Sequence, residues 1–309
     1  QKLQEPCLPE TIGSNAYELR EHQEATIKAW KNDGYLGVFA LATGAGKTIT
    51  AIHAAYLVYD ALRQHSGKLI LIVSVPFINL ADQWRDNLRL YNIHSIPCYG
   101  SRTSWEDQFR QSLDAFNVGV RDFLCVVVVN ATLRGDTFQA LVQGIPGRNL
   151  MIIGDECHHY GSASLAKALP DQAKFRIGLS ATPEHYIDED ATSRITDYFG
   201  RIVFEYDLRQ ALEDGVLSPY KYYVQTVELT SDEAEVYLDL TADIGALMSQ
   251  RAGSGRLPKN LDERLGRLLM DRARLGGAAE NKPPALDAVL AGRPRRLARA
   301  DVVRSHPRL

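Results

Sequence analysis

LGVFALATGAGKTITAIHAAYLVYDALRQH, residues 36–65, places an apolar run, a glycine-containing turn and a helix-like segment in direct succession. The run at 36–41 is typical of a strand that is buried on both faces, and 48–65 carries apolar residues at helical spacing. The turn ATGAGKT (42–48) ends as a phosphate-binding loop does, although Leu41 stands where such loops usually have their first glycine. This order of strand, loop and helix predicts a nucleotide site.

The residues of the turn have distinct expected tasks. A triphosphate needs several convergent backbone N–H groups, and Gly44 and Gly46 allow the backbone to come close enough. The Lys47 ammonium should reach the β and γ phosphate oxygens, and the Thr48 hydroxyl should ligate Mg²⁺. The expected phosphate-binding residues are Thr43, Gly44, Ala45, Gly46, Lys47 and Thr48, and the expected metal ligands are Thr48 and Asp155.

Outward from this segment, apolar runs alternate with helix-like segments over about residues 17–205. Further strands are predicted at 68–75, 123–130, 149–156 and 175–181, and further helices at 79–91 and 164–170. Alternation of this kind predicts an α/β fold with a parallel, doubly wound sheet. Ligands of such sheets bind beyond the carboxyl ends of the strands.

DECH (155–158) follows the apolar run LMIIG and therefore lies at a predicted strand end. Asp155 can hold Mg²⁺ through its water shell, and Glu156 can polarise the attacking water, so both are expected to be catalytic together with Lys47. We expect the acidic pair to face Lys47 across adjacent strand tips. Zinc binding by Cys157 and the two following histidines is disfavoured, because no second ligand pair has suitable spacing.

Composition limits the class of protein. The chain has 309 residues, of which 45% are apolar and 24% charged, as in soluble globular proteins. Its longest apolar runs are far shorter than the roughly 20 residues that a membrane span needs. Four separated cysteines without a C-x-x-C pair favour a reducing cytoplasm over disulfides. Because the chain begins with Gln1, we expect it to start inside a longer reading frame.

Six motifs in order, LREHQ, ATGAGKT, VPFINLADQW, VVNAT, DECH and LSAT, resemble the first RecA-like domain of superfamily 2 helicases over about residues 17–225. The resemblance implies that ATP and Mg²⁺ are the cofactors and that Arg20 and Gln23 read the adenine. It also implies that Ser180 and Thr182 couple hydrolysis to strand movement. It places six residues near nucleic acid, of which the two at 101–102 are a guess: Pro76, Phe77, Ser101, Arg102, Asn130 and Thr132. Trp84, in the same motif as Pro76, is expected to pack in the core instead.

LRxHQ and VPxxxLxDQW resemble the DNA-repair and restriction branch, and the flank at 198–223 resembles the domain junction of restriction- and phage-defence-associated helicases. The resemblance implies a motor acting on double-stranded DNA. DECH itself does not decide DNA against RNA, so an RNA helicase stays open as an alternative. A non-catalytic ATP-sensing scaffold is a second alternative, because nothing after Tyr223 matches the Q-x-x-G-R-x-x-R motif by which the second RecA-like domain supplies arginine fingers. We therefore expect that second domain to be missing from this chain, and the chain alone to bind and hydrolyse ATP weakly.

The expected domains are an N-terminal extension at 1–16, the ATP-binding domain at 17–222, a junction with an incomplete helical second domain at 223–290, and a basic, disordered tail at 291–309. Around the boundary at 222–223, a helix is predicted at 208–217 and a strand at 219–230. A helix at 231–250 capped by Ser231 and a linker at 252–260 are predicted to follow. Residues 251–309 hold 14 Lys or Arg against 6 Asp or Glu. A basic arm that meets phosphates is one interpretation, and a segment that follows a truncation or a frame disruption is the other.

Overall fold

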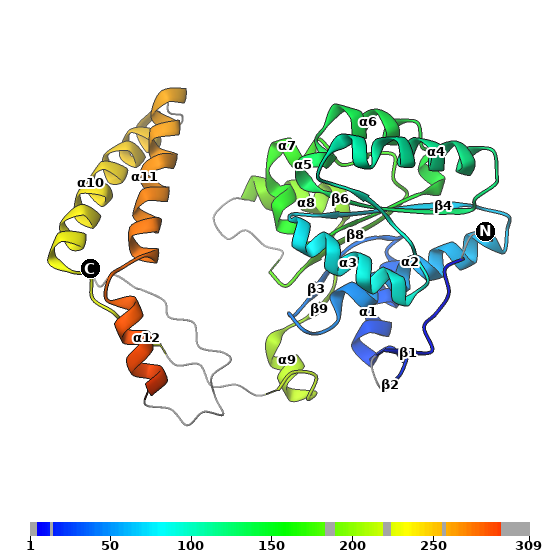
Figure 1. Ribbon diagram of the computed structural model, residues 1–309, viewed down its shortest axis with the longest axis horizontal. Coiled ribbons are helices and arrows are strands. Elements are labelled where there is room, and N and C mark those ends of the chain that lie inside the picture. Colours follow the sequence, from blue (N-terminus) through cyan, green and yellow to red (C-terminus); the bar gives the residue numbers. More distant parts are fainter. Residues whose placement is uncertain (1–4, 13–14, 183–188, 219–223, 255–257, 292–309) are drawn as a thin grey trace. The chain divides into compact units, whose positions relative to one another are not determined.

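The computed structural model describes residues 5–12, 15–182, 189–218, 224–254 and 258–291 (Figure 1). The chain divides into two compact units, residues 1–218 and residues 219–309. Each unit is described by itself below. Among the described residues, no helix combines the length and the apolar character that crossing a membrane requires.

The first unit is built on a seven-stranded sheet in the order β5-β6-β4-β7-β8-β3-β9, in which every pairing is parallel. This confirms the predicted α/β class. The strands are β3 (Leu36–Leu41), β4 (Leu69–Val75), β5 (Ile96–Cys98), β6 (Phe123–Val129), β7 (Leu150–Gly154), β8 (Phe175–Ser180) and β9 (Ile202–Tyr206). The edge strands β5 and β9 were not predicted. β5 is short and contains Pro97, which only an edge position tolerates well, and β9 has Glu205 among its apolar residues.

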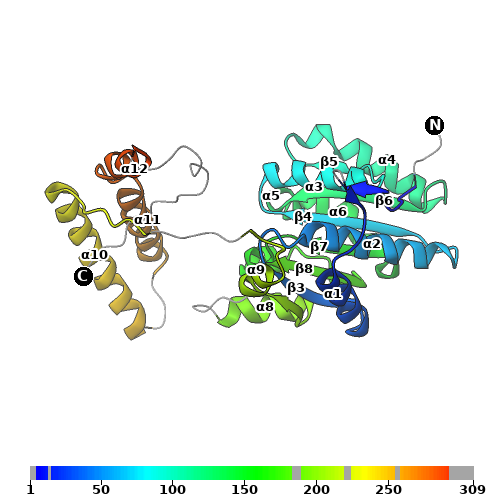
Figure 2. The ribbon, with the colours of Figure 1, turned by 90° about the horizontal axis from the view of Figure 1, so that it is seen from below.

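The sheet is covered on both faces, as Figures 1 and 2 show. Successive side chains of β4 alternate between two apolar clusters: Leu69, Leu71 and Val73 belong to one, and Ile70 and Ile72 to the other. Helices α1 (Glu21–Asn32), α2 (Lys47–Arg63) and α3 (Ile78–Leu90) cover the first face. Helices α4 (Glu106–Asn117), α5 (Asn130–Leu133), α6 (Asp136–Gln143), α7 (Ala163–Ala166) and α8 (Glu189–Phe199) cover the second. The sheet is therefore doubly wound.

The helices predicted at 48–65 and 79–91 are present as α2 and α3. The helix predicted at 208–217 is present as α9 (Leu208–Glu213) but ends earlier than predicted. The helix predicted at 164–170 is wrong in extent, because α7 ends at Ala166 and the chain turns before Pro170.

Residues before α1 pack against the domain. Strands β1 (Thr11–Ile12) and β2 (Asn15–Ala16) pair antiparallel, and the Cys7 N–H donates to the Tyr91 carbonyl over 2.9 Å. Behind this segment the Tyr17 hydroxyl lies 2.6 Å from His53 Nδ1 and 2.5 Å from the Tyr91 hydroxyl. The N-terminal segment therefore contributes hydrogen bonds to the interior next to α2.

His53 should make the fold sensitive to acid. Burial, assisted by the charge of Lys31, lowers the pKa of His53 to about 4, below the ordinary value near 6.5. The folded state thus favours the neutral ring, so its contribution to stability is present above pH 6.5 and is lost as the pH falls toward 4. Between pH 7 and pH 4.5 we expect the native chain to lose on the order of 1 kcal/mol more than His53→Gln, or a few degrees of melting temperature. Thermal melts of both chains at the two pH values test this, and equal losses would contradict it.

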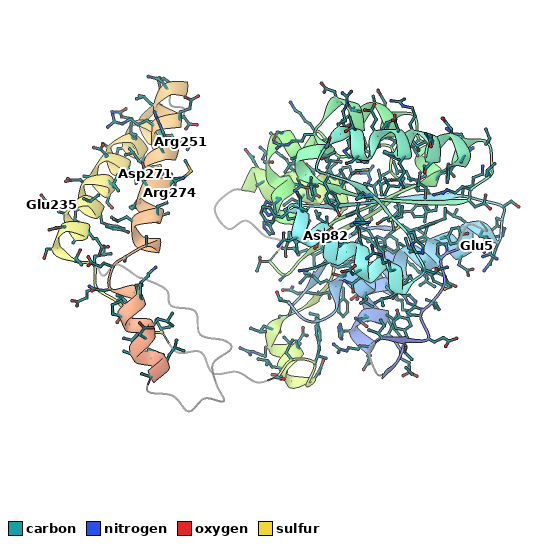
Figure 3. All side chains as sticks on the ribbon, in the orientation of Figure 1. Glu5, Asp82, Glu235, Arg251, Asp271 and Arg274 are labelled. Carbon is teal, nitrogen blue, oxygen red and sulfur yellow. The ribbon has the colours of Figure 1, made fainter. Side chains whose placement is uncertain are left out.

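The second unit is helical in its described part. It contains α10 (Ser231–Ser254), α11 (Lys259–Gly277) and α12 (Lys282–Ala291). A small apolar cluster joins α10 and α11, with Ile244, Leu247 and Leu265 buried at its centre. Arg274 and Asp271, labelled in Figure 3, form an exposed ion pair within α11. Arg264 and Asp243 form another between α11 and α10.

Three local predictions in this unit need correction. Residues 224–230 form no strand, because they have no strand to pair with among the described residues; 219–223 lie outside the described part. Thr230 rather than Ser231 caps α10, since Thr230 and Glu233 exchange side-chain and backbone hydrogen bonds of 3.0 and 3.4 Å. The linker predicted at 252–260 is partly helical, because α10 continues to Ser254 and α11 begins at Lys259. Almost all of the predicted basic tail, 292–309, lies outside the described residues.

Candidate functional site

All seven strands of the sheet point the same way, so their carboxyl ends share one edge. The predicted phosphate- and metal-binding residues follow β3 and β7, the predicted coupling residues lie at the end of β8, and the predicted nucleic-acid residues follow β4, β6 and β5. The predicted adenine-reading residues Arg20 and Gln23 lie instead at the start of α1. The expectation that the loop and the acidic pair occupy adjacent strand tips is wrong, because β8 lies between β3 and β7. The end of β8 carries Ser180, so this residue lies between the two.

The loop after β3 is shaped by two left-handed glycines, Gly44 at φ +87° and Gly46 at φ +88°, the latter capping α2. Lys47 turns back over the loop, and its Nζ donates to the Leu41 carbonyl over 3.1 Å. Leu41 is still the last residue of β3 and is fully buried. A glycine is therefore not required there, which accounts for the departure from the usual motif.

The loop presents a graded surface. Thr43 and Gly44 are exposed, Gly46, Lys47 and Thr48 are half-buried, and Ala45 is buried beneath them. Burial lowers the pKa of Lys47, while the charges of Glu156 and Asp155 oppose this change. The loop after β3 and the acidic pair after β7 lie at the same edge of the sheet, and the negative charges of the pair favour the protonated form of Lys47.

The first turn of α1 braces this loop from the side. The His22 ring lies 2.9 Å through Nε2 from the Ala45 carbonyl and stacks on Tyr206 with ring centroids 4.1 Å apart. Gln23 is buried, and its Nε2 lies 3.4 Å from the same carbonyl while its Oε1 accepts from the Arg20 N–H at 2.9 Å. The loop-supporting role of His22 was missed by sequence reasoning, although His22 stands between Arg20 and Gln23 in LREHQ.

An open pocket of about 760 Å³ lies next to His22 and belongs wholly to the first unit. Its lining comes from α1, β9 and the residues around α9: Arg20, Glu21, His22, Ala25, Phe204, Tyr206, Gln210, Asp214, Gly215 and Val216. Tyr206 donates its hydroxyl to Asp214 over 2.8 Å. Since β9 was not predicted, this wall of the pocket could not be foreseen.

Asp155 directly follows β7 and is only 8% exposed. Its N–H donates to the Ser74 carbonyl at the end of β4, its Oδ1 accepts from the Glu156 N–H at 2.9 Å, and its Oδ2 accepts from Trp84 Nε1 at 2.7 Å. Glu156 has φ +46°, a left-handed conformation that residues other than glycine rarely adopt. The chain therefore turns sharply after Asp155, and the Glu156 carboxylate reaches 3.4 Å from His158 Nδ1.

Ser180 and Thr182 lie at the end of β8. Ser180 is completely buried, and its hydroxyl accepts the Thr182 N–H over 3.1 Å. Thr182 is exposed. Ser180 thus shapes the turn, while Thr182 is the one of the pair that presents its side chain to solvent.

Asn130 occupies an interior position at the end of β6, with 7% of its surface exposed. Its Oδ1 accepts from the Ser74 hydroxyl at 3.0 Å and from the Tyr160 hydroxyl at 3.1 Å. Tyr160 lies in the short 3₁₀ helix η3 (Cys157–Gly161) after DECH. The side-chain oxygen of Asn130 therefore joins β4, β6 and the segment after Asp155, and does not point at solvent.

The other residues predicted to meet nucleic acid are accessible to different degrees. Phe77 is 59% exposed at the start of α3, and its ring makes an edge contact with His159 at a centroid distance of 6.0 Å. Pro76 and Thr132 are half-buried. Ser101 and Arg102 are exposed after β5, where Arg102 pairs with Glu106 over 2.9 Å.

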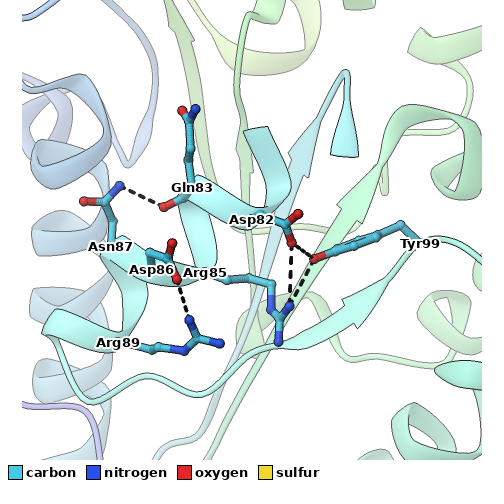
Figure 4. Close-up of polar contacts among 7 residues, drawn as sticks. All are labelled: Asp82, Gln83, Arg85, Asp86, Asn87, Arg89 and Tyr99. Atoms are coloured by element: carbon cyan, nitrogen blue, oxygen red, sulfur yellow. Dashed lines mark hydrogen bonds and ion pairs between the residues drawn. The ribbon is translucent and has the colours of Figure 1, made fainter. Parts of the chain in front are cut away.

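Helix α3 begins beside Phe77, a predicted nucleic-acid residue, and contacts Asp155, a predicted metal ligand, through Trp84. Figure 4 shows its outer side, where Asp82 accepts from the Tyr99 hydroxyl at 2.6 Å and Arg85 donates to the same hydroxyl at 3.1 Å. Its inner side carries Trp84, which is 2% exposed, as the sequence predicts for a core residue. The hydrogen bond from Trp84 to Asp155 was not predicted, because nothing in the sequence sets the distance between two residues 71 positions apart.

The donor set fits Mg²⁺ bound together with a triphosphate. Within the described ranges, no group of three or more His, Cys, Asp or Glu side chains could hold a metal by itself. Mg²⁺ commonly takes one or two protein oxygens and completes its shell with phosphates and water. The Thr48 hydroxyl and the Asp155 carboxylate are oxygens of this kind, whereas burial raises the pKa of the Cys157 thiol and makes it a poor ligand.

Residues 16–185 match the family model described as the res subunit of type III restriction enzymes. A DNA 3'-5' translocase, XPB2, of Sulfurisphaera tokodaii is 25% identical over 83% of this chain and 50% of its own length. The EcoAI type I restriction endonuclease subunit of Escherichia coli is 29% identical over 63% of this chain and 22% of its own. The chain thus spans half or less of the length of these relatives.

The fold has counterparts among solved structures. The ATP-dependent type ISP restriction-modification enzyme LlaBIII, solved bound to DNA, superposes with a TM-score of 0.53 over 95% of this chain and 25% of its own, at 17% identity. At that identity the likeness concerns the fold alone.

Proposed function

The chain belongs to the family of the res subunit of type III restriction enzymes, and on that premise we propose that it is the ATP-binding half of a DNA translocase or helicase motor. The family places it among helicase-type ATPases, whose first RecA-like domain the doubly wound sheet represents. The supporting observation is that the Lys47 loop follows β3 and the pair Asp155 and Glu156 follows β7, so both lie at the carboxyl edge of one parallel sheet.

Each residue has a proposed task in ATP handling. The loop N–H groups and Lys47 hold the phosphates, helped by the positive amino end of α2. Thr48 and Asp155 hold Mg²⁺, which when bound neutralises charge on the β and γ phosphates. Glu156 is placed to orient the attacking water and accept its proton. Ser180 and Thr182, between these groups, are proposed to couple hydrolysis to movement.

The adenine is proposed to lie near Arg20 and Gln23. The open pocket that Arg20 lines adjoins the loop through His22, so a nucleotide could place its phosphates on the loop and its base toward this pocket. Gln23 would exchange its weak contacts of 3.4 and 3.5 Å with the loop carbonyls for contacts with the base.

We propose double-stranded DNA as the substrate along which the motor moves. The names of the curated relatives describe a DNA translocase and a restriction endonuclease subunit, which favours DNA over RNA for this chain. Exposed Phe77, Ser101 and Arg102 and half-buried Pro76 and Thr132 are the proposed contacts on the β4, β6 and β5 half of the edge. Asn130 would act from within by holding the ends of β4 and β6 together.

Replacing Lys47 by alanine should weaken ATP binding on the order of 100-fold. The ammonium is expected to make charge-assisted hydrogen bonds to the phosphates, each contributing roughly 1.5–3 kcal/mol. Titration of the chain with a fluorescent ATP analogue in the presence of Mg²⁺ measures the change.

Lys68→Ala is a matched control, because the Lys68 Nζ also donates to a backbone carbonyl, that of Phe116, over 2.9 Å. Lys68 directly precedes β4 and therefore lies at the amino edge of the sheet, away from the loop that carries Lys47. Unchanged ATP binding by Lys47→Ala would sink the proposed nucleotide site. A lost affinity without any cellular consequence would favour the scaffold alternative.

A further inference from the structure

Trp84 has an unusual position for a core residue. It is 2% exposed on the inner side of α3, and its indole N–H donates to Asp155 Oδ2 over 2.7 Å. An indole has one donor and no acceptor, so the polarity of this contact is fixed. The ring is held by the surrounding apolar cluster and has little freedom to turn away.

The contact completes a set of fixed donors and acceptors around the aspartate. Oδ2 is held by Trp84, Oδ1 by the Glu156 N–H, and the backbone N–H by the Ser74 carbonyl. A carboxylate that accepts a hydrogen bond at each oxygen keeps one orientation, so the direction of its remaining lone pairs is fixed as well. Hydrogen bonds to a charged acceptor are stronger than those to a neutral one, so the loss of such a bond at a buried site has a large free-energy cost.

We propose that Trp84 is a positioning residue for the metal site: its indole N–H holds the Asp155 carboxylate in the orientation that binds Mg²⁺. This inference rests on the proposed function, since it takes Asp155 to be a magnesium ligand. Removing a partner of a metal ligand typically costs about 10- to 100-fold in metal affinity or activity. An aromatic ring without the N–H group should therefore keep the fold and lose the magnesium affinity.

Trp84→Phe is the direct test, and the chain offers a closely matched control. Trp30 is also fully buried in the same apolar cluster, and its indole N–H also donates over 2.9 Å, but to the Arg176 carbonyl. Both substitutions delete one indole donor from one core, whereas only Trp84→Phe touches the Asp155 carboxylate.

The measurement is the Mg²⁺ concentration that gives half-maximal binding of a fluorescent ATP analogue, with unfolding curves of each chain. Trp84→Phe should raise this concentration about 10- to 100-fold, while Trp30→Phe leaves it within about twofold of the native value. In an Asp155→Asn background, Trp84→Phe should add little further change, because the carboxylate that Trp84 orients is already gone. Equal midpoints for the two tryptophan variants, or fully additive effects with Asp155→Asn, would overturn the proposal.

A second readout covers the case in which Trp84→Phe does not fold. In a Trp30→Phe, Trp105→Phe chain, Trp84 is the one remaining tryptophan. Its fluorescence should change when Mg²⁺ and ATP are added together and should respond less after Asp155→Asn. Trp84 emission that changes neither when Mg²⁺ and ATP are added nor after Asp155→Asn would also refute the positioning role. Failure of the native chain to bind the analogue would instead refute the proposed function.

Discussion

ATP turnover by the 309-residue chain alone should be slow, roughly 10³- to 10⁵-fold below that of a motor equipped with an arginine finger, and DNA should not raise it. The fingers of this superfamily come from a Q-x-x-G-R-x-x-R motif, and the sequence after Tyr223 has no match to it. The described part of residues 219–309 is helical and adds no second sheet. In the proposed site, Lys47 and bound Mg²⁺ would then compensate the negative charge that develops on the transferred phosphate without the help of such arginines.

The measurement is phosphate release by the purified chain with and without duplex DNA, single-stranded DNA and RNA. Lys47→Ala sets the background, because traces of a contaminating ATPase would survive that substitution. Turnover at about 1 s⁻¹ or faster that DNA stimulates would contradict the prediction, since that rate belongs to complete phosphoryl-transfer sites. Stimulation by RNA but not by DNA would favour the RNA-helicase alternative.

Replacing Glu156 by glutamine should lower the remaining hydrolysis roughly 10²- to 10⁴-fold, the usual contribution of a general base. Glutamine keeps the shape of the side chain but cannot accept a proton from water. The loop, Lys47, Thr48 and Asp155 are untouched, so binding of ATP should change little. The variant therefore separates hydrolysis from binding, which Lys47→Ala cannot do.

Single-turnover cleavage of radiolabelled ATP, with a parallel binding titration, measures both quantities on a slow enzyme. Glu213→Gln makes the same change of charge on exposed α9 and should leave both values as they are. If Glu156→Gln hydrolyses ATP at the native rate, another group activates the water, and His158, whose Nδ1 lies 3.4 Å from the Glu156 carboxylate, is the first to examine.

The central strands were predictable because each is apolar on both faces. A strand such as FLCVVVV at 123–129 is apolar on both faces, so the pattern indicates a parallel sheet that is covered on two sides. The alternation of such strands with helix-like segments favours the doubly wound arrangement. The edge strands follow no such rule. Only three residues of β5 pair with β6, and β9 mixes Glu205 with apolar residues, so neither shows a pattern distinct from that of a loop.

Local chemistry in the sequence determined the class of site. A glycine-containing turn with Lys47 and Thr48 and an acidic pair after a later strand are recognisable because their neighbours along the chain create the geometry they need. Their placement at one edge then follows from the parallel direction of the strands.

What only the tertiary structure decided is which side chains support these groups. Trp84 contacts Asp155, Asn130 joins Ser74 to Tyr160, and His22 braces Ala45. Each of these contacts joins residues that are distant in the chain, and its existence depends on strand order, on helix position and on packing to within a few tenths of an ångström. Periodicity and motif spacing carry no information on such distances, because they describe one segment at a time.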